Sequence, residues 1–232
     1  MSNFVIFAII ENNMPGMKPK QKVNIKWSPE FAYAIGLLAT DGNLSSDGRH
    51  FDLTSKDIDQ LKTFLRCLRI HNKIGKKISG YSGKSHFRIQ FGDVLFYKFL
   101  LCIGLTPAKS KTMGALDIPK RYFFDFLRGS FDGDGTFYSY WDPRWKSSFM
   151  FYTVFISASK KHTSWLRHRL RHLLNINGHI THDSNKSTYQ LKYAKKESVK
   201  LLRRIYYSKH IPALARKRLK IERALGIVGI TL

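Results

Sequence analysis

The sequence has few cysteines, few acidic residues and no long apolar segment. Its cysteines, Cys67 and Cys102, lie in separate helical patterns, which argues against a disulfide-built secreted domain and against a zinc finger. The longest purely apolar run, Phe4–Ile10, is far shorter than the roughly 20 residues that span a bilayer. That run also lacks the basic flank and small-residue cleavage site of a secretion signal. We therefore expect neither a membrane partner nor secretion.

The scarcity of acidic residues leaves the chain strongly basic. Its 232 residues include 40 Lys+Arg and 16 Asp+Glu, a formal net charge of +24. A chain with this excess repels itself, and its natural counterpart is a polyanion. With 43% hydrophobic and 14% aromatic residues, it is too apolar to be a disordered basic tail. The composition indicates a folded protein of one large domain or two small ones, whose partner is a nucleic acid.

The order of predicted elements occurs twice, after an arm over residues 1–27 that we expect to be flexible or loosely packed. In the half over 28–104, the periodicity predicts helices over 29–42, 57–69 and 94–104, with hairpins over 43–55 and over 74–92, turning near Gly80–Gly83. A linker over 105–120 leads to the half over 121–232, with helices over 122–135, 160–175 and 196–207, hairpins over 136–158 and 178–194, and a basic helical tail over 211–226. Each half reads αββαββα. We predict an α+β fold with pseudo-two-fold symmetry.

The first helix of each half ends in the same short motif. AIGLLATDG (34–42) and LRGSFDGDG (127–135) both place a Gly five residues before an Asp and another Gly directly after it. The offset is constant, since 129 − 36 and 134 − 41 both equal 93. One Asp-Gly helix end is ordinary capping chemistry. Two at identical spacing within a repeat favour a shared function.

The motif predicts how the two helices meet. Gly36 and Gly129 each begin a stripe of small residues, along which another backbone can approach closely. If the helices pack about the pseudo-two-fold axis, Asp41 and Asp134 lie close together at their C-terminal ends. Carboxylates are disfavoured beside each other and at the negative end of a helix dipole. We therefore predict a divalent metal between them, suited to phosphodiester hydrolysis.

These motifs resemble those of single-chain LAGLIDADG homing endonucleases, and the resemblance covers residues 28–222. The second motif keeps both acidic positions, Asp132 and Asp134, whereas the first has Ala39 and Asp41 there. The resemblance implies two saddle-shaped antiparallel sheets with the two motif helices packed at the centre. The later acid of each motif is the catalytic one in that family.

The resemblance also implies the ligands of the metal. Asp41 and Asp134 would be both catalytic residues and metal ligands, and the backbone carbonyls of Thr40 and Gly133 would complete the coordination. The expected cofactors are two or three Mg²⁺ or Mn²⁺ ions at the motif-helix ends.

Further site residues follow from the same resemblance. The linker and the tail resemble segments that supply a basic residue near the scissile phosphate. Lys109 is the candidate in the linker, and Arg216 and Lys217 compete in the tail, with Lys217 taken as catalytic. A water-organising polar residue would fall near Ser55 and Ala158, at the ends of the second strands.

Polar faces of the predicted strands supply candidate DNA contacts. Arg and Gln suit bidentate contacts with guanine and adenine, and Lys and Arg in hairpin turns suit phosphates, although a solvated sheet face is also polar. We expect the aromatic residues over 137–145 to pack beneath a hairpin rather than stack on bases. The candidate DNA-binding residues are Lys76, His86, Arg88, Gln90, Arg144, Lys146, Lys186, Thr188, Gln190 and Lys192.

The resemblance implies a homing endonuclease, intron-encoded or free-standing: a monomer that breaks both strands of a long, specific DNA site by metal-dependent hydrolysis. The alternatives are an RNA maturase, whose partner would be its host intron RNA, and a non-cleaving DNA-binding protein. Such relatives often lose a motif acid, and both acids are kept here. A basic ribosome-associated protein would leave the repeated motifs unexplained. We expect the protein in the cytoplasm (nucleoid) of a prokaryote or in an organelle.

Overall fold

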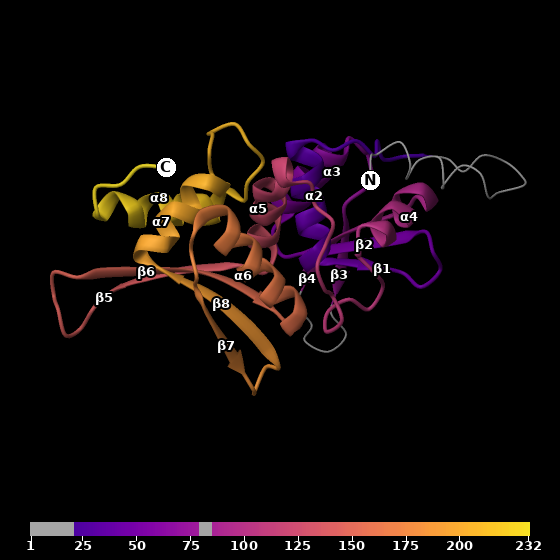
Figure 1. Cartoon of the computed structure of the whole chain (residues 1–232). Helices are drawn as coiled ribbons and strands as arrows, with labels where there is room; N and C mark the ends of the chain where they lie inside the picture. Colours follow the sequence, from indigo (N-terminus) through magenta and orange to yellow (C-terminus); the bar gives the residue numbers. More distant parts are fainter. Residues whose placement is uncertain (1–20, 79–84) are drawn as a thin grey trace, which may run out of the picture.

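Two antiparallel sheets of identical topology flank a central pair of helices (Figure 1). This computed structural model describes residues 21–78 and 85–232. The strand orders are β1-β2-β4-β3 and β5-β6-β8-β7, so each strand of the second half takes the place of its first-half counterpart. The predicted α+β class and the αββαββα repeat are confirmed.

The boundaries of most elements lie within a few residues of those predicted. The first half contains α2 (Pro29–Thr40), β1 (Gly42–Leu44), β2 (His50–Ser55), α3 (Ile58–Leu68), β3 (Gly75–Ile78), β4 (Ser85–Gly92) and α4 (Val94–Cys102). The second contains η1 (Lys120–Tyr122), α5 (Phe123–Gly133), β5 (Thr136–Trp141), β6 (Phe149–Ser157), α6 (Lys160–Leu174), β7 (His179–Asp183), β8 (Thr188–Ala194), α7 (Lys195–Ile205) and α8 (Ala215–Ile227). The turn predicted near Gly80–Gly83 lies outside the described residues.

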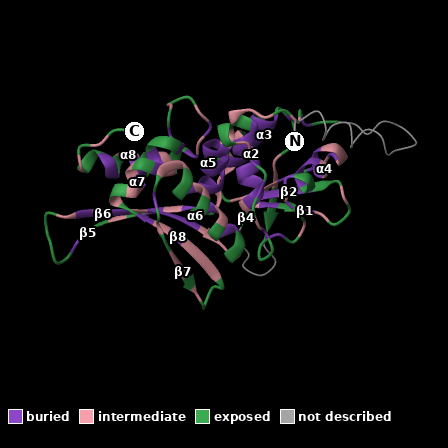
Figure 2. Cartoon of the chain, in the orientation of Figure 1, coloured by how far each residue is buried: buried purple, intermediate pink, exposed green. Residues whose placement is uncertain are grey.

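The motif helices α2 and α5 form the centre of the core. Residues 31–39 of α2 and 123–132 of α5 are all buried, and Figure 2 shows both helices enclosed while the β5–β6 turn is exposed. A helix buried on all sides has no solvated polar face, and the buried part of α2 is apolar accordingly. The buried stretch of α5 also contains polar residues, and these have partners within the protein: Arg128, for example, forms an ion pair with Asp125. Within the described part of the chain, no helix combines the length and apolar character needed to cross a membrane.

The tail helix begins later than its sequence pattern indicates. The prediction placed its start at residue 211, but α8 starts at Ala215. The preceding segment is extended because it is tied to α5: the Leu214 amide donates to the Asp132 carboxylate at 2.7 Å, and Arg128 Nε donates to the Pro212 carbonyl at 2.7 Å. These contacts compete with local helix formation.

The last residues of the predicted N-terminal arm are packed against the first half. The backbone amides of Lys22 and Val23 donate to the Asp93 carboxylate at 2.7 and 2.9 Å, and the Val23 side chain is buried. Asp93 also caps α4 by accepting from the Phe96 amide. This carboxylate therefore joins the incoming chain to the start of α4. Residues 1–20 of the arm lie outside the described residues.

Candidate active site and nucleic-acid interface

Glycines let the two motif helices touch backbone to backbone. A Cβ atom on Gly36 would lie 2.2 Å from a carbonyl oxygen of α5, and one on Gly129 would lie 2.1 Å from the Tyr33 carbonyl oxygen. At the helix ends, a Cβ atom on Gly133 would lie 2.0 Å from Thr40 Oγ1. No side chain fits at such distances, so the two helices pack along the stripes that the sequence predicted.

This packing brings the carboxylates of Asp41 and Asp134 to the same place. Burial first, and then the charge of Asp134, raises the pKa of Asp41 from 3.8 to about 6. Burial also raises the pKa of Asp134, and the ammonium groups of Lys217 and Lys109 oppose that rise. A cation bound between two buried carboxylates that repel each other stabilises the ionised form of both.

The oxygen donors at this place fit a divalent metal ion. No group of three or more His, Cys, Asp or Glu side chains gathers into a potential metal site among the described residues. Two carboxylates therefore need other oxygen ligands, and Mg²⁺ commonly takes one or two protein carboxylates together with substrate phosphates and water. The Asp134 carboxylate accepts no hydrogen bond from the described residues, which leaves its oxygens available.

A lysine stands beside each carboxylate in the same geometry. Lys109 Nζ donates to the carbonyl of Gly42, and Lys217 Nζ donates to the carbonyl of Gly135. These two glycines directly follow the motif acids and are related by the repeat, since 135 − 42 is again 93. Burial lowers the pKa of both lysines to about 8. They therefore keep most of their positive charge at neutral pH.

The same geometry distinguishes the two basic residues left open in the tail. Lys217 Nζ also donates to the carbonyls of Phe131 and Gly133, at 2.6 and 3.1 Å, so it lies against the C-terminal end of α5. Arg216 Nε instead donates to Asp57 at 3.0 Å, at the N-terminus of α3. Lys217 is thus the structural counterpart of Lys109.

Gln60 holds the Asp41 carboxylate, a contact that the sequence analysis missed. Its Nε2 donates to Asp41 Oδ2 at 3.0 Å, and its Oε1 accepts from Ser55 Oγ at 2.6 Å. Gln60 is only 4% exposed. The available signal was its place in the buried stripe of α3, where it precedes Phe64 by four residues. Ser55 lies at the predicted position but acts on Asp41 through Gln60.

The second half has a histidine where the first has Gln60. Both residues follow the serine that ends the second strand by five positions, Ser55 in β2 and Ser157 in β6. Ser157, rather than the predicted Ala158, therefore corresponds to Ser55. His162 Nδ1 lies 2.9 Å from the Gly114 carbonyl, which can only accept a hydrogen bond. Burial lowers the pKa of His162 to about 4, so the ring is neutral at pH 7.

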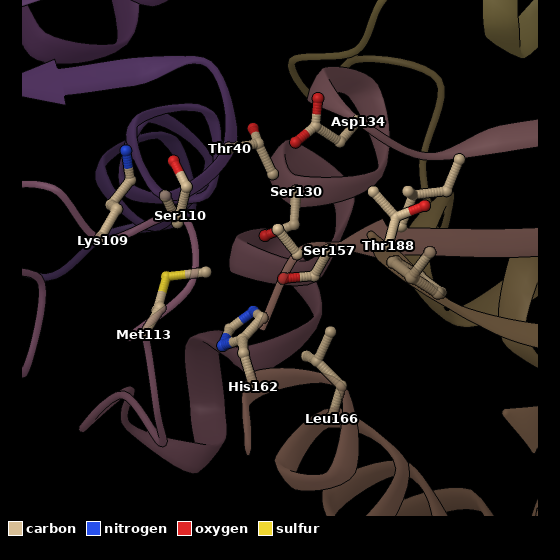
Figure 3. Close-up of a pocket in the computed structure, with 14 residues that line it drawn as sticks. Thr40, Lys109, Ser110, Met113, Ser130, Asp134, Ser157, His162, Leu166 and Thr188 are labelled. Carbon is tan, nitrogen blue, oxygen red and sulfur yellow. The ribbon is translucent and has the colours of Figure 1, made fainter. Parts of the chain in front are cut away.

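Beside Asp134 lies a cavity of about 380 Å³. In Figure 3, His162 and Ser157 point into it from the second half, while Lys109 and Ser110 line it from the linker. Asp41 is absent from its lining. The two motif acids thus share one location but have different neighbours.

Asp132, the first acid of the second motif, has a separate role. It is 1% exposed and accepts hydrogen bonds from the hydroxyls of Tyr33 and Tyr206, at 2.8 and 3.2 Å, and from the Leu214 amide. It joins both motif helices to the tail. Ala39 occupies this position in the first motif, so the first half lacks the anchor.

The sheets have one face covered by helices and one face without them (Figure 1). Directly paired strand residues share a face. Arg88 and Gln90 lie opposite Thr54 and Asp52, and Arg88 forms an ion pair with Asp52. On the predicted DNA-binding face, His86 pairs with Lys77, whereas Lys76 pairs with Phe87 on the other face. Lys77, not Lys76, belongs to the polar face.

The second sheet places its predicted contacts in a similar way. Gln190 pairs with Thr181 and Lys192 pairs with His179, which puts both on the uncovered face with Thr188. The remaining three candidates lie in hairpin turns. Arg144 binds Asp142, with Nη2 3.1 Å from the carboxylate, and Lys146 and Lys186 are exposed.

The chain is similar in fold to several solved structures. No family model matches the sequence, and no curated protein matches it. The homing endonuclease I-WcaI bound to its DNA recognition sequence is 13% identical, with a TM-score of 0.60 over 92% of this chain and 96% of that chain. The chain has the LAGLIDADG fold.

Two further structures with the LAGLIDADG fold match. I-DmoI in complex with DNA and Mn is 16% identical, with a TM-score of 0.51 over 78% of this chain and 97% of that chain. Full-length DUF199/WhiA from Thermatoga maritima is 16% identical, with a TM-score of 0.54 over 90% of this chain and 69% of that chain. The LAGLIDADG fold is therefore common to endonucleases and to a protein not described as one.

Proposed function

We propose that this chain is a site-specific, metal-dependent endonuclease that makes a double-strand break in duplex DNA. One observation carries the proposal: two motif carboxylates, each with a lysine on the carbonyl of the glycine that follows it, meet where the two halves join. A double-strand break needs one such centre for each strand, and the pseudo-two-fold repeat supplies two. The net charge of +24 suits a polyanionic substrate.

The side chains have distinct tasks in this mechanism. Asp41 and Asp134 would hold Mg²⁺ or Mn²⁺, which supplies activation of water and stabilisation of charge on the attacking and leaving oxygens. Lys109 and Lys217 present ammonium groups where negative charge develops on the scissile phosphates. Gln60 fixes the direction of the Asp41 carboxylate. Because the carboxylates act from helix ends held by backbone packing, little reorganisation accompanies the reaction.

The protein would act as a monomer. One chain carries both motifs, so a monomer suffices for both strands. As a homing endonuclease, whether intron-encoded or free-standing, it would act in the nucleoid of a prokaryote or in an organelle. I-WcaI and I-DmoI were each determined with DNA, and I-DmoI with Mn, which supports duplex DNA and a divalent ion as partners.

A second candidate is a DNA-binding protein that does not cleave, because the WhiA structure matches 90% of this chain, between the 78% of I-DmoI and the 92% of I-WcaI. An RNA maturase acting on intron RNA would use the same basic surface. Retention of both motif acids, each with its lysine, favours the endonuclease, since neither alternative needs clustered carboxylates on a basic surface.

The test is selection of cleavable sites from a randomised duplex library in the presence of Mg²⁺. We expect wild-type protein to yield a specific long site, and Asp134→Asn and Asp41→Asn to cleave it at least about 100-fold more slowly, with binding retained. Chelation of the metal should stop cleavage without releasing DNA. Full cleavage by Asp134→Asn would contradict the assignment of Asp134 as a catalytic residue. Binding without cleavage by wild-type protein would favour the DNA-binding protein that does not cleave.

A further inference from the structure

The β5–β6 hairpin carries a group of tyrosines on the uncovered face of the second sheet. Tyr138 pairs with Tyr152, and Tyr140 pairs with Met150. The rings of Tyr138 and Tyr152 stack at 5.2 Å with an angle of 17°, and those of Tyr140 and Tyr152 at 6.3 Å with 7°. We call Tyr138, Tyr140, Tyr152 and Met150 the tyrosine patch. The patch places aromatic rings and one thioether side by side, and each tyrosine also carries a hydroxyl.

This patch belongs to the same face as the predicted base contacts of the second half. Val154, two residues from Tyr152 in β6, pairs with Lys192, and alternate residues of a strand share a face. The other face carries Phe137 and Phe151, which are buried. That side is covered by α8, where Lys220 donates to the Phe137 carbonyl at 2.7 Å. The sequence analysis expected the aromatic residues over 137–145 to pack beneath the hairpin, and among them only Phe137 is buried.

The tyrosines remain accessible although they are large and apolar. Tyr138 is 37% exposed and Tyr140 is 41% exposed. Exposed aromatic residues that share one face mark a binding surface more often than scattered ones do. The basic residues Arg144 and Lys146 lie in the turn of the same hairpin, where they suit phosphates beside the patch.

Among the residues that the structure describes, the first sheet has no equivalent of this patch. Its β1–β2 hairpin pairs only three positions, whereas β5 and β6 pair six. On the uncovered face of the first sheet, Asn43 pairs with Asp52, and Asp52 pairs with Gln90. These side chains offer amide and carboxylate groups. Both sheets therefore present hydrogen-bonding groups on the uncovered face, and the second sheet adds the aromatic rings of its longer β5–β6 hairpin.

Duplex DNA offers one apolar group in its major groove, the C5-methyl group of thymine. Stacking on aromatic side chains instead requires unpaired bases, which a duplex does not present. We propose that the tyrosine patch recognises thymine methyl groups at the outer end of the half-site beneath the second sheet. The proposal rests on the DNA-binding part of the proposed function and not on cleavage.

The test measures duplex affinity without divalent metal, on a site obtained by selection for binding. An iron–EDTA probe on Ser147→Cys, in a Cys102→Ser background, first marks which half-site lies beneath the β5–β6 hairpin. Each thymine of both half-sites is then replaced by 2′-deoxyuridine, which lacks only the methyl group. We expect affinity to fall about fourfold for each contacted thymine beneath the second sheet, and to stay unchanged beneath the first.

Protein variants test whether the tyrosine patch causes the loss of affinity on replacing thymine by deoxyuridine. Tyr140→Ala should remove the difference between thymine and deoxyuridine, whereas Trp145→Ala, an exposed aromatic in the turn of the same hairpin, should keep it. Equal tolerance of deoxyuridine in both half-sites, no selected thymine beneath the second sheet, or unchanged discrimination by Tyr140→Ala would each overturn the inference. Failure of wild-type protein to bind any duplex would instead remove the proposed function.

Discussion

Asp132 and Asp134 belong to one motif, yet their carboxylates face different surroundings. Asp132 accepts three hydrogen bonds, from the hydroxyls of Tyr33 and Tyr206 and from the Leu214 amide. Burial raises its pKa, and the hydrogen bonds from the Leu214 amide and the Tyr33 hydroxyl oppose that rise. Asp134 accepts none from the described residues and is stabilised only by the charges of Lys217 and Lys109. One acid is a structural anchor, and the other is available to a ligand.

The same Asp→Asn change should therefore have opposite consequences at the two positions. Asn at 132 places an amide donor among three donors, so Asp132→Asn should lower the free energy of unfolding by about 2–3 kcal/mol. Asp134→Asn removes a buried charge beside Asp41 and should leave metal-free stability equal or higher. Urea unfolding of both variants at pH 7 measures this. Equal destabilisation by the two changes would contradict the separation of roles.

At the scale of the elements, α2 and α5 decide where the site forms. Their contact depends on Gly36 and Gly129, because the backbone of the neighbouring helix occupies the space that a Cβ atom would fill. Helix propensity alone would favour alanine at both positions. The glycines thus lower the intrinsic stability of each helix in exchange for a close approach that aligns the two helix ends.

We expect Gly129→Ala to lower the free energy of unfolding by about 3 kcal/mol or more, because its Cβ atom would lie 2.1 Å from the Tyr33 carbonyl oxygen. The control is Gly226→Ala in α8, where a Cβ atom would meet nothing within 4 Å. That change should raise stability by up to about 1 kcal/mol. Denaturant unfolding distinguishes the two. A neutral Gly129→Ala protein would show that the helices tolerate separation.

At the scale of the whole molecule, the pseudo-two-fold symmetry holds for the backbone and the lysines but fails at the third residue of each centre. Gln60 holds Asp41, whereas His162 binds the linker at Gly114 and leaves Asp134 beside a cavity. If both centres cleave, their carboxylates are not equally positioned. The two strands of the duplex should then respond differently to changes at these residues.

Gln60→Met keeps the volume of the side chain but loses the amide donor, so it should slow cleavage of one strand by about 5–10-fold relative to the other. Single-turnover rates on a duplex labelled separately on each strand give this ratio. His162→Met is the matched control in the other half and should leave the ratio near its wild-type value. A proportional slowing of both strands by Gln60→Met would contradict a local role.

Local sequence features were sufficient for the repeat, the element order and the motif acids. Capping residues and apolar spacing depend on neighbours a few positions apart, so they can be read along the chain. The glycine stripes likewise predicted the contact of α2 with α5. The sequence pattern did not predict the late start of α8, because the hydrogen bonds that hold the tail are made to α5, more than 80 residues away.

The sequence by itself thus determined a basic, two-fold repeated α+β chain with Asp41 and Asp134 at paired helix ends. Only the tertiary structure assigned Gln60 to Asp41, set Lys217 rather than Arg216 opposite Lys109, and gave Asp132 its anchoring contacts. It also placed the tyrosines on the uncovered face of the second sheet. These outcomes depend on contacts between distant segments and on strand register, which local periodicity does not encode.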